Sequence, residues 1–222
     1  MAASALPRWR PATLIYRRDV TPDTQTVPLH TALCDKAYMK TQRILIRDET
    51  GHDVAVITEV TIAAFAGLEI SNHTEQYIIE ALRSAGALTL SLVAEVGGRV
   101  VGHIAFSPVS ISDGTPNWYG LGPVSVLPLY QRQGIGKALI REGLLRLRDL
   151  GAGGCCLVGH PEYYKQLGFT NVAGLVHRGV PSEALYAWSF RGRFPQGEVM
   201  FHDGFAANGQ QRQARDAIAS RP

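Results

Sequence analysis

The chain has few cysteines, only three among its 222 residues. Cys34 stands alone, and Cys155 and Cys156 are adjacent, so their spacing forms neither a metal-ligand pattern nor a disulfide framework. The adjacent pair lies in an apolar run, which is typical of small buried side chains on a strand. The cysteines therefore predict no metal site, and they fit a reducing, cytoplasmic location.

Long apolar runs and a strong charge of one sign are missing as well. No segment reaches the ~18 apolar residues of a membrane span, and the N-terminus lacks the apolar stretch of a secretory signal. The formal net charge of +3 is too small to predict a nucleic-acid surface. We therefore expect neither a membrane nor a nucleic acid as a partner.

The length predicts one domain with a core of ordinary size. Residues 1–38 contain arginines and prolines without sustained periodicity, and we expect them to be an extension outside the core. A translated segment upstream of Met39 and a cleaved targeting peptide both remain open explanations for it. Residues 39–205 carry the expected domain. Residues 206–222 are polar, and we expect a frayed helix or a disordered tail.

Alternating and helical apolar patterns locate the elements of this domain. Strands are expected at 42–47, 88–95, 99–109, 118–127, 155–158, 185–190 and 198–201, and helices at 53–65, 74–83, 134–149 and 162–167. Gly97 and Gly98 predict a hairpin, and Asp53 is placed as the N-cap of the first helix. This order of elements predicts an α/β (α+β) single domain, a mixed central sheet flanked by helices.

A strand that ends at Leu127 leads into Gln131-Arg132-Gln133-Gly134-Ile135-Gly136-Lys137, which opens a long amphipathic helix. The first amides of a helix have no partner within the helix, and the helix dipole favours an anion there. Glycine removes the Cβ atoms that would keep a phosphate away from these amides. The junction therefore predicts a phosphate site.

Two common phosphate motifs do not fit this junction. A dinucleotide fingerprint needs Gly-x-Gly-x-x-Gly, but Leu139 occupies its third glycine position. A nucleotide P-loop needs a first glycine, where this chain has Gln131, and a hydroxyl after the lysine, where it has Ala138. Neither motif explains the junction.

The remaining pattern, Gln131-x-x-Gly134-x-Gly136 after Val124-Ser125-Val126-Leu127-Pro128, resembles the acetyl-CoA-binding motif of the GCN5-related N-acetyltransferase (GNAT) superfamily. The runs LGPVSVLPLYQRQGIGKALI and VGHPEYYKQLGF resemble its small bacterial members, and the similarity covers about Arg43 to Phe205. The resemblance implies a GNAT-like fold with a splayed strand pair. It also implies transfer of an acetyl group from acetyl-CoA to a primary amine of a small molecule, peptide or protein.

The same resemblance assigns the cosubstrate contacts. The diphosphate is expected on the backbone amides that follow the strand, with the side chains of Arg132 and Lys137 either adding charge or simply solvated. The pantetheine arm is expected on the strand, with the Val126 amide directed at the thioester carbonyl. The expected cofactor-binding residues are Val124, Ser125, Val126, Gln131, Arg132, Gln133, Gly134, Ile135, Gly136, Lys137, His160 and Tyr164.

Tyr164 occupies the position of the general-acid tyrosine of the superfamily, and a phenol can protonate a thiolate of comparable basicity. Tyr163 should point about 100° away along the helix and pack. The general base is not resolved: Glu69, His73 and His103 are candidates on the substrate side, and a water chain would also suffice. His160 is a further candidate, and it stands where many members have an asparagine that contacts pantetheine.

Two other functions are weighed beside acetyl transfer to an amine. A non-catalytic acyl-CoA-binding regulatory module would keep the glycine motif but would need no acid at Tyr164. Acylation of a nucleic-acid amine is disfavoured because the domain is nearly neutral. The acceptor, the length of the acyl group and a homodimeric state are left open.

Overall fold

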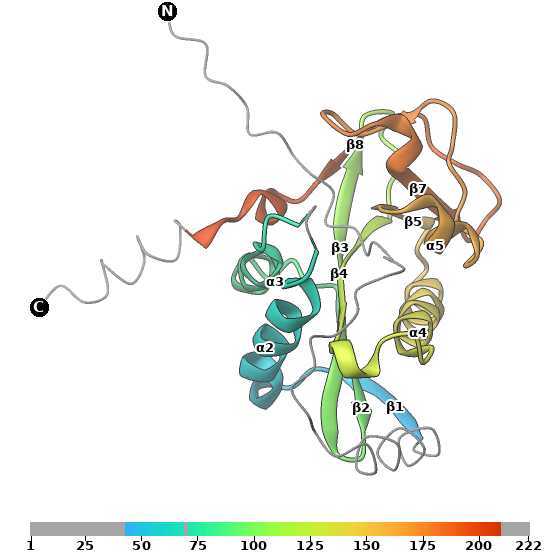
Figure 1. Ribbon diagram of the computed structural model, residues 1–222. Helices are drawn as coiled ribbons and strands as arrows, with labels where there is room; N and C mark the ends of the chain where they lie inside the picture. The colour runs from blue at the N-terminus through green and yellow to red at the C-terminus, as the bar shows by residue number, and fades with distance from the viewer. Residues whose placement is uncertain (1–42, 69–70, 210–222) are drawn as a thin grey trace, which may run out of the picture.

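The computed structural model describes residues 43–68 and 71–209. The expected extension at 1–38, Cys34, the candidate Glu69 and most of the expected tail lie outside the described residues, so the domain limits 39–205 stay a prediction. The centre of the fold is an eight-stranded sheet (Figure 1). Its strands are β1 Ile44–Asp48, β2 Leu90–Val96, β3 Arg99–Ile111, β4 Trp118–Val126, β5 Gly154–Val158, β6 Leu175–Val176, β7 Leu185–Ser189 and β8 Gly197–Phe201.

The sheet is mixed. Its main path is β1-β2-β3-β4-β5-β7, in which only the β4–β5 pair is parallel. The long strand β3 also pairs at its far end with β8, and β8 pairs in parallel with the short β6. The predicted fold class, a mixed sheet flanked by helices, is confirmed.

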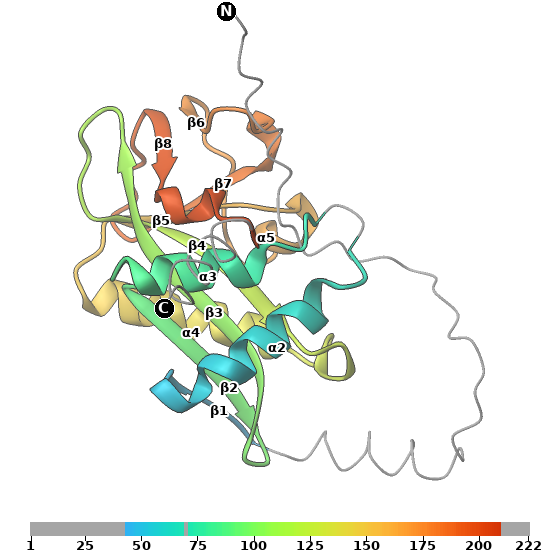
Figure 2. The same cartoon turned by 90° about the vertical axis from the view of Figure 1, so that its left-hand side faces the viewer.

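Helices cover both faces of this sheet (Figures 1 and 2). The helices α2 (Val54–Phe65) and α3 (Glu75–Ser84) lie on one face, and α4 (Ile135–Asp149) lies on the other. The short helix α5 (Pro161–Lys165) follows β5. Single 3₁₀ turns complete the connections: η1 Gly51–Asp53, η2 Pro128–Tyr130, η3 Ser182–Ala184 and η4 Asp203–Ala206.

Every strand and helix expected from the sequence is present, with ends within two residues of the predicted ones. The core is built from the apolar faces that gave those predictions. Ile140, Leu144 and Leu147 of α4 are buried, and the buried Gly143 packs directly against the ring of Phe106 on β3. The two-residue strand β6 was not predicted, because two residues are too short to show a pattern.

Cys155 and Cys156 are fully buried on β5, as predicted. Burial raises the pKa of the Cys156 thiol to about 12, and it also raises the pKa of Cys155. Both cysteines are therefore protonated thiols that pack as small apolar groups.

The role given to Asp53 needs correction. Asp53 stands at the N-cap position of α2, but its carboxylate makes no hydrogen bond to the helix amides. It accepts hydrogen bonds from the Thr50 amide and hydroxyl, and it forms an ion pair with Arg47 at 2.7 Å. The Arg47 guanidinium holds the pKa of Asp53 well below its usual range. Asp53 therefore joins β1 to the start of α2 rather than capping the helix.

Candidate active site

The strands β4 and β5 form a fork. They pair only at Trp118, Tyr119 and Gly120, whose partners are Gly154, Cys155 and Cys156. Beyond Gly120, β4 continues beside β3 as far as Val126 without a further β5 partner in the described chain. The predicted splayed strand pair is therefore present, and its opening lies on the β5 side of β4.

The main chain of β4 points into this opening at two of the predicted residues. The Leu127 amide donates to the Val101 carbonyl at 2.9 Å. Antiparallel partners alternate between bonded and non-bonded positions, so Val126 opposite Gly102 and Val124 opposite Ile104 take non-bonded positions. Their amides and carbonyls therefore face away from β3, toward the fork.

The junction between β4 and α4 has the geometry of an anion site. Arg132 and Gly134 both have positive φ, 61° and 88°, and Gly134 is the N-cap of α4. Left-handed residues in such a turn direct successive amides toward one point. A Cβ on Gly134 would meet no atom of the described chain within 4 Å, so the space over this amide is open. Gln131 Nε2 donates to the Val126 carbonyl at 3.0 Å and so ties the loop to the strand.

The two tyrosines of α5 differ in burial and in contacts. Tyr164 is buried in the main core beside Phe169, and burial raises the pKa of its hydroxyl. Tyr163 is half-buried, packs edge-on against Tyr164, and places its hydroxyl only 2.9 Å from where a Cβ on Gly136 would lie. Tyr163 therefore packs as expected, and its hydroxyl also lies at the first turn of α4.

His160 lies two residues beyond the end of β5 and is the N-cap of α5. Its carbonyl accepts hydrogen bonds from the amides of Tyr163 and Tyr164, at 3.2 and 3.3 Å. Lys137 Nζ lies 3.4 Å from the side-chain oxygen of Gln166 and so connects α4 to the end of α5. The bonds to the His160 carbonyl are internal to the start of α5, so the Lys137–Gln166 contact is the one of these that links α5 to α4.

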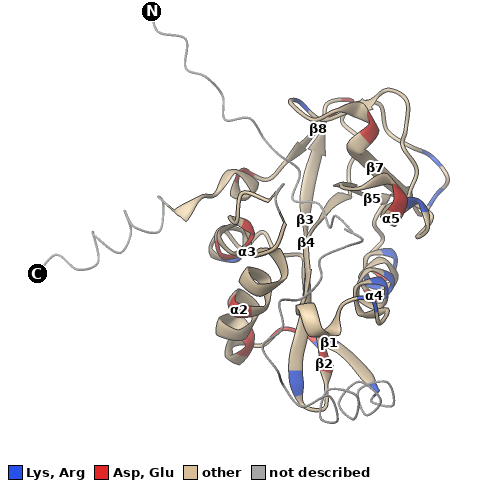
Figure 3. Cartoon of the chain, in the orientation of Figure 1, with Lys and Arg blue, Asp and Glu red and all other residues tan. Residues whose placement is uncertain are grey.

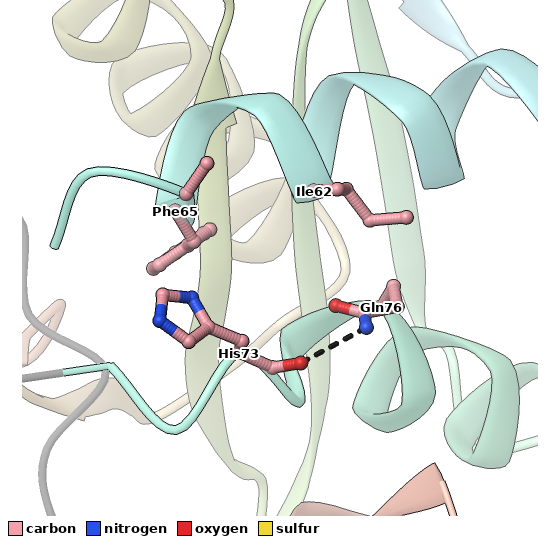
Figure 4. Close-up of a pocket in the computed structure, with 5 residues that line it drawn as sticks. Ile62, Phe65, His73 and Gln76 are labelled. Atoms are coloured by element: carbon pink, nitrogen blue, oxygen red, sulfur yellow. Dashed lines mark hydrogen bonds between the residues drawn. The ribbon is translucent and has the colours of Figure 1, made fainter.

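A pocket opens between α2 and α3 on the other face of the sheet (Figure 4). It has a volume of about 290 Å³ and is lined by Ile62, Phe65, Ala66, His73 and Gln76. The His73 imidazole points into it, and the Gln76 side chain donates to the His73 carbonyl at 2.9 Å. Of the two substrate-side candidates that the structure describes, His73 lines this pocket and His103 does not.

His103 lies apart from the pocket, in a series of hydrogen-bonded polar side chains on the side of the sheet that α2 and α3 cover. Its Nε2 lies 2.8 Å from the Ser91 hydroxyl, which contacts the Glu49 carboxylate, and Arg83 pairs with Glu49 at 2.8 Å. His103 is fully buried, and desolvation lowers its pKa to about 4. Glu49 and Ser91 were not predicted as site residues, because single polar residues at strand ends carry no spacing signal.

Figure 3 shows arginines and lysines along α4 and acidic residues on α2 and α3. Basic side chains on α4 lie on the side of the sheet that carries the phosphate junction. Lys137, the third residue of α4, places a positive charge at the junction end of the helix, whereas Arg146 and Arg148 lie in its last turn.

Comparisons with known proteins agree with this geometry. The chain matches the acetyltransferase (GNAT) domain over residues 88–171. It is 34% identical over 127 residues to the uncharacterized N-acetyltransferase YhbS of Escherichia coli, covering 57% of this chain and 73% of that protein.

Two crystal structures are similar over most of the chain. One is a GNAT family acetyltransferase from Brucella melitensis in complex with acetyl-CoA, with 48% identity and a TM-score of 0.66. That match covers 73% of this chain and 98% of the other. The second is YhbS from Escherichia coli in complex with CoA, with 31% identity, a TM-score of 0.68 and coverage of 76% and 95%.

The chain belongs to the GNAT family of acetyltransferases. This confirms the resemblance read from the two motifs, and with it N-acetyltransferase activity and acetyl-CoA as the cosubstrate. The site fits that cosubstrate, because an open, glycine-lined helix N-terminus adjoins a strand whose main chain faces a fork.

Within residues 43–68 and 71–209, no group of three or more potential ligands is placed to hold a metal ion. In the same ranges, no helix is long and apolar enough to span a membrane. The cytoplasmic location and the homodimeric state stay predictions.

Proposed function

We propose that this chain transfers the acetyl group of acetyl-CoA directly to a primary amine of a small molecule, or of a peptide or protein, at the β4–β5 fork. The observation that carries the proposal is the continuity of two features. The main chain of Val124 and Val126 faces the fork, and the same strand leads into the open helix N-terminus at Gly134.

Each end of the fork has its own task. The amides from Arg132 to Lys137 bind the diphosphate, because the start of α4 carries orphan donors and a positive dipole. The main-chain groups of Val124 and Val126 bind the pantetheine arm in the way that a neighbouring strand would. Bound there, acetyl-CoA supplies an activated acyl group on a thiol leaving group.

Two residues of the chain act on the reacting atoms. The Val126 amide donates to the thioester carbonyl, and an amide so placed is worth about 3 kcal/mol in other enzymes. Tyr164 donates its hydroxyl proton to the leaving thiolate. Its raised pKa keeps the hydroxyl protonated at neutral pH, so the proton is available for transfer to the thiolate.

Calorimetry with acetyl-CoA, CoA and ATP tests the proposal. We expect binding of acetyl-CoA and CoA and no binding of ATP, since the junction lacks the hydroxyl of a nucleotide P-loop. Gly134→Val should weaken both coenzymes, because a β-branched residue is strained at a φ of 88° and fills the open space over the amide. Binding of ATP alone would overturn the proposal.

Thiol release in the presence of an amine mixture distinguishes an enzyme from a regulatory acyl-CoA-binding module. The enzyme releases CoA only when an amine is present, and its product gains the mass of an acetyl group. A module that binds acetyl-CoA releases none.

A further inference from the structure

The ring of Tyr164 is closely surrounded by other rings. Tyr164 is only 4% exposed, and its ring meets those of Tyr163 and Phe169 edge-on, with centroids 5.0 and 5.8 Å apart. Phe169 is itself 1% exposed and packs against Trp188. Protein interiors are close-packed and yield little to added volume. The position of the Tyr164 ring is therefore sensitive to any atom added beside it.

Gly159 is a further neighbour of this ring. It lies between β5 and α5, within the motif VGHPEYYKQLGF, and it is buried. A Cβ on Gly159 would lie 2.2 Å from Cε2 and 2.7 Å from Cδ2 of Tyr164. Cε2 is bonded to the ring carbon that carries the hydroxyl group. Gly159 therefore faces the edge of the ring next to the group that donates the proton.

Space, and not backbone conformation, requires glycine at this position. Gly159 does not have the positive φ that favours glycine, so its backbone conformation is open to alanine as well. Carbon atoms pack at about 3.5–4.0 Å. A Cβ on Gly159 and the Tyr164 ring would therefore have to separate by more than about 1 Å.

The main chain at Gly159 is tied to the neighbouring strand. The strands β5 and β7 pair as far as Val158 opposite Leu185, and the Gly159 amide extends this ladder by donating to the Ala184 carbonyl at 2.9 Å. A shift of the Gly159 main chain would strain that hydrogen bond. The displacement caused by a side chain would therefore fall mainly on the Tyr164 ring.

The contacts of Tyr163 connect the Tyr164 ring to the fork. Tyr163 packs on Tyr164 and places its hydroxyl 2.9 Å from the Cβ position of Gly136, and Val126 Cγ2 lies 3.8 Å from the same position. Burial raises the pKa of Tyr164, and the neighbouring Tyr163 and Cys155 raise it further. Cys155 belongs to the last pairs of β4 with β5. The ring therefore lies close to β5, and one side chain separates it from Val126 and the start of α4.

We propose that Gly159 is a positioning residue for acetyl transfer, because the absence of a side chain there places the Tyr164 hydroxyl where it meets the leaving thiolate. The proposal rests on the proposed acetyl transfer with Tyr164 as its acid. The proton passes from the Tyr164 oxygen to the sulfur as the carbon–sulfur bond breaks, and a proton that the amine nitrogen loses restores the phenol. Such a transfer needs donor and acceptor within hydrogen-bond distance.

Gly159→Ala tests the position of the acid. Thiol release is measured with a mixture of ethylamine, lysine, spermidine and phenethylamine, and we expect its rate to fall roughly 100-fold, the effect of a misplacement of about 1 Å. The dissociation constant of acetyl-CoA, measured by calorimetry, should change much less than the rate. A wild-type rate, or an equal loss of affinity and rate, would overturn the proposal.

Combination with Tyr164→Phe separates positioning from a general disturbance of the structure. Phenylalanine has no proton to donate, so the exact place of its ring no longer affects the transfer. We expect Gly159→Ala to slow the Tyr164→Phe enzyme by less than about threefold, because the two substitutions act through the same group. A further fall as large as in the wild type would refute the proposal.

Gly143 offers a matched control. A Cβ there would lie 2.2 Å from Phe106 Cε2, the same distance as at Gly159, but in the core between α4 and β3. Gly143→Ala and Gly159→Ala should both lower the free energy of unfolding, and Gly143→Ala should keep most of the rate per folded molecule. Similar rate losses in the two variants would mean that any overpacking of the core slows the enzyme, and would remove the specific role of Gly159.

Tyr164→Leu tests the contact even if Gly159→Ala folds poorly. Leucine has no atom at the Cε2 position, and its branch can rotate away from an added methyl group. Gly159→Ala should therefore cost less stability in the Tyr164→Leu background than in the wild type, as measured by urea denaturation. Equal costs would show that the methyl group does not meet the Tyr164 ring, and would end the proposal.

Carbon-13 labelling of the tyrosine rings reads the position of Tyr164 without an acceptor. Its ring signals are those missing from the spectrum of Tyr164→Phe. They should shift in Gly159→Ala, because the ring moves relative to Tyr163 and Phe169, and they should shift far less in Gly143→Ala. Unshifted signals in Gly159→Ala would mean that the ring keeps its place beside the methyl group, against the proposal.

These measurements separate the role of Gly159 from the function on which it rests. If the wild type acetylates none of the amines, the proposed function fails, and the role of Gly159 fails with it. If Tyr164→Phe is slow but Gly159→Ala is not, acetyl transfer and its acid stand and only the role of Gly159 is lost. If Tyr164→Phe keeps the wild-type rate, acetyl transfer stands without this acid and without this role for Gly159.

Discussion

His103 Nε2 lies 2.8 Å from the Ser91 hydroxyl oxygen, and that hydroxyl contacts the Glu49 carboxylate. Ser91 has one proton, and the carboxylate can only accept it. Ser91 therefore accepts a hydrogen bond from His103, which must carry its proton on Nε2 and a lone pair on Nδ1. Desolvation lowers the pKa of this buried imidazole and keeps it neutral at physiological pH.

The neutral state of His103 predicts a pH-dependent stability. The imidazole has a pKa of about 6.5 in the unfolded chain but only about 4 in the fold. The unfolded state therefore binds more protons between these values, and the free energy of unfolding should fall by about 2 kcal/mol from pH 7 to pH 5. Urea denaturation at both pH values measures this difference.

His103→Gln is the matched variant for that measurement. It removes the titrating group and should lose most of the stability difference between pH 7 and pH 5. Glu49 and Asp53 have lowered pKa values and lose their contributions only at more acidic pH. The same pH dependence in wild type and variant would contradict a neutral His103.

Tyr164→Phe should lower the rate of acetyl transfer by about 10²–10⁴-fold, the usual contribution of a general acid. The dissociation constant of acetyl-CoA should change much less than the rate, because only the hydroxyl is lost and the ring keeps its packing against Phe169. Single-turnover thiol release and calorimetry measure the two quantities. Tyr163→Phe is the control and should keep most of the rate. If the Tyr164→Phe enzyme transferred acetyl at the wild-type rate, Tyr164 would not be the general acid and would serve only in packing.

Gly136→Ala should weaken the binding of acetyl-CoA roughly tenfold. The new Cβ would lie 2.9 Å from the Tyr163 hydroxyl, so either the tyrosine or the first turn of α4 must shift at the phosphate site. Alanine itself favours the helix by ~1 kcal/mol, so affinity is the informative readout. Adding Tyr163→Phe removes the clashing oxygen and should restore the affinity. No recovery in the double variant would refute this contact.

Gly143→Ala should destabilise the protein despite the same gain in helix propensity. Its Cβ would come into collision with the Phe106 ring, inside the core between α4 and β3. Overpacking of this kind costs about 1–3 kcal/mol, which exceeds the ~1 kcal/mol gained from alanine. A double-mutant cycle with Phe106→Leu, measured by urea denaturation, should show a favourable coupling. Additive effects would contradict the clash.

The fold was largely predictable because its elements are encoded locally. Apolar alternation in β2 and β3 with Gly97 and Gly98 between them defined a hairpin, and the spacing of apolar residues defined α4. The phosphate site was predictable for the same reason, since a strand, a glycine turn and a helix N-terminus are neighbours in the sequence.

The buried polar contacts were not predictable in this way. Arg47 and Asp53 lie in adjacent elements, but their ion pair depends on how β1 enters α2. Glu75 looked like an ordinary acidic residue in the first turn of a helix, a common and favourable place for one. Only the packing of α3 against the sheet reveals that its carboxylate is buried with one oxygen unpartnered in the described chain. Long-range contacts of this kind leave no periodic trace in the sequence.

The fork divides the sheet into two parts. Along the main path of the sheet, strands β1–β4 form one part, and β5 and β7 form the other. Three residue pairs between β4 and β5 join the two parts. A molecule bound along the unpaired edge of β4 would act as an additional strand and connect the two parts of the sheet. We expect amide exchange in β5 and β7 to slow when it binds, so that occupancy of the site can be followed by the exchange rates of these two strands.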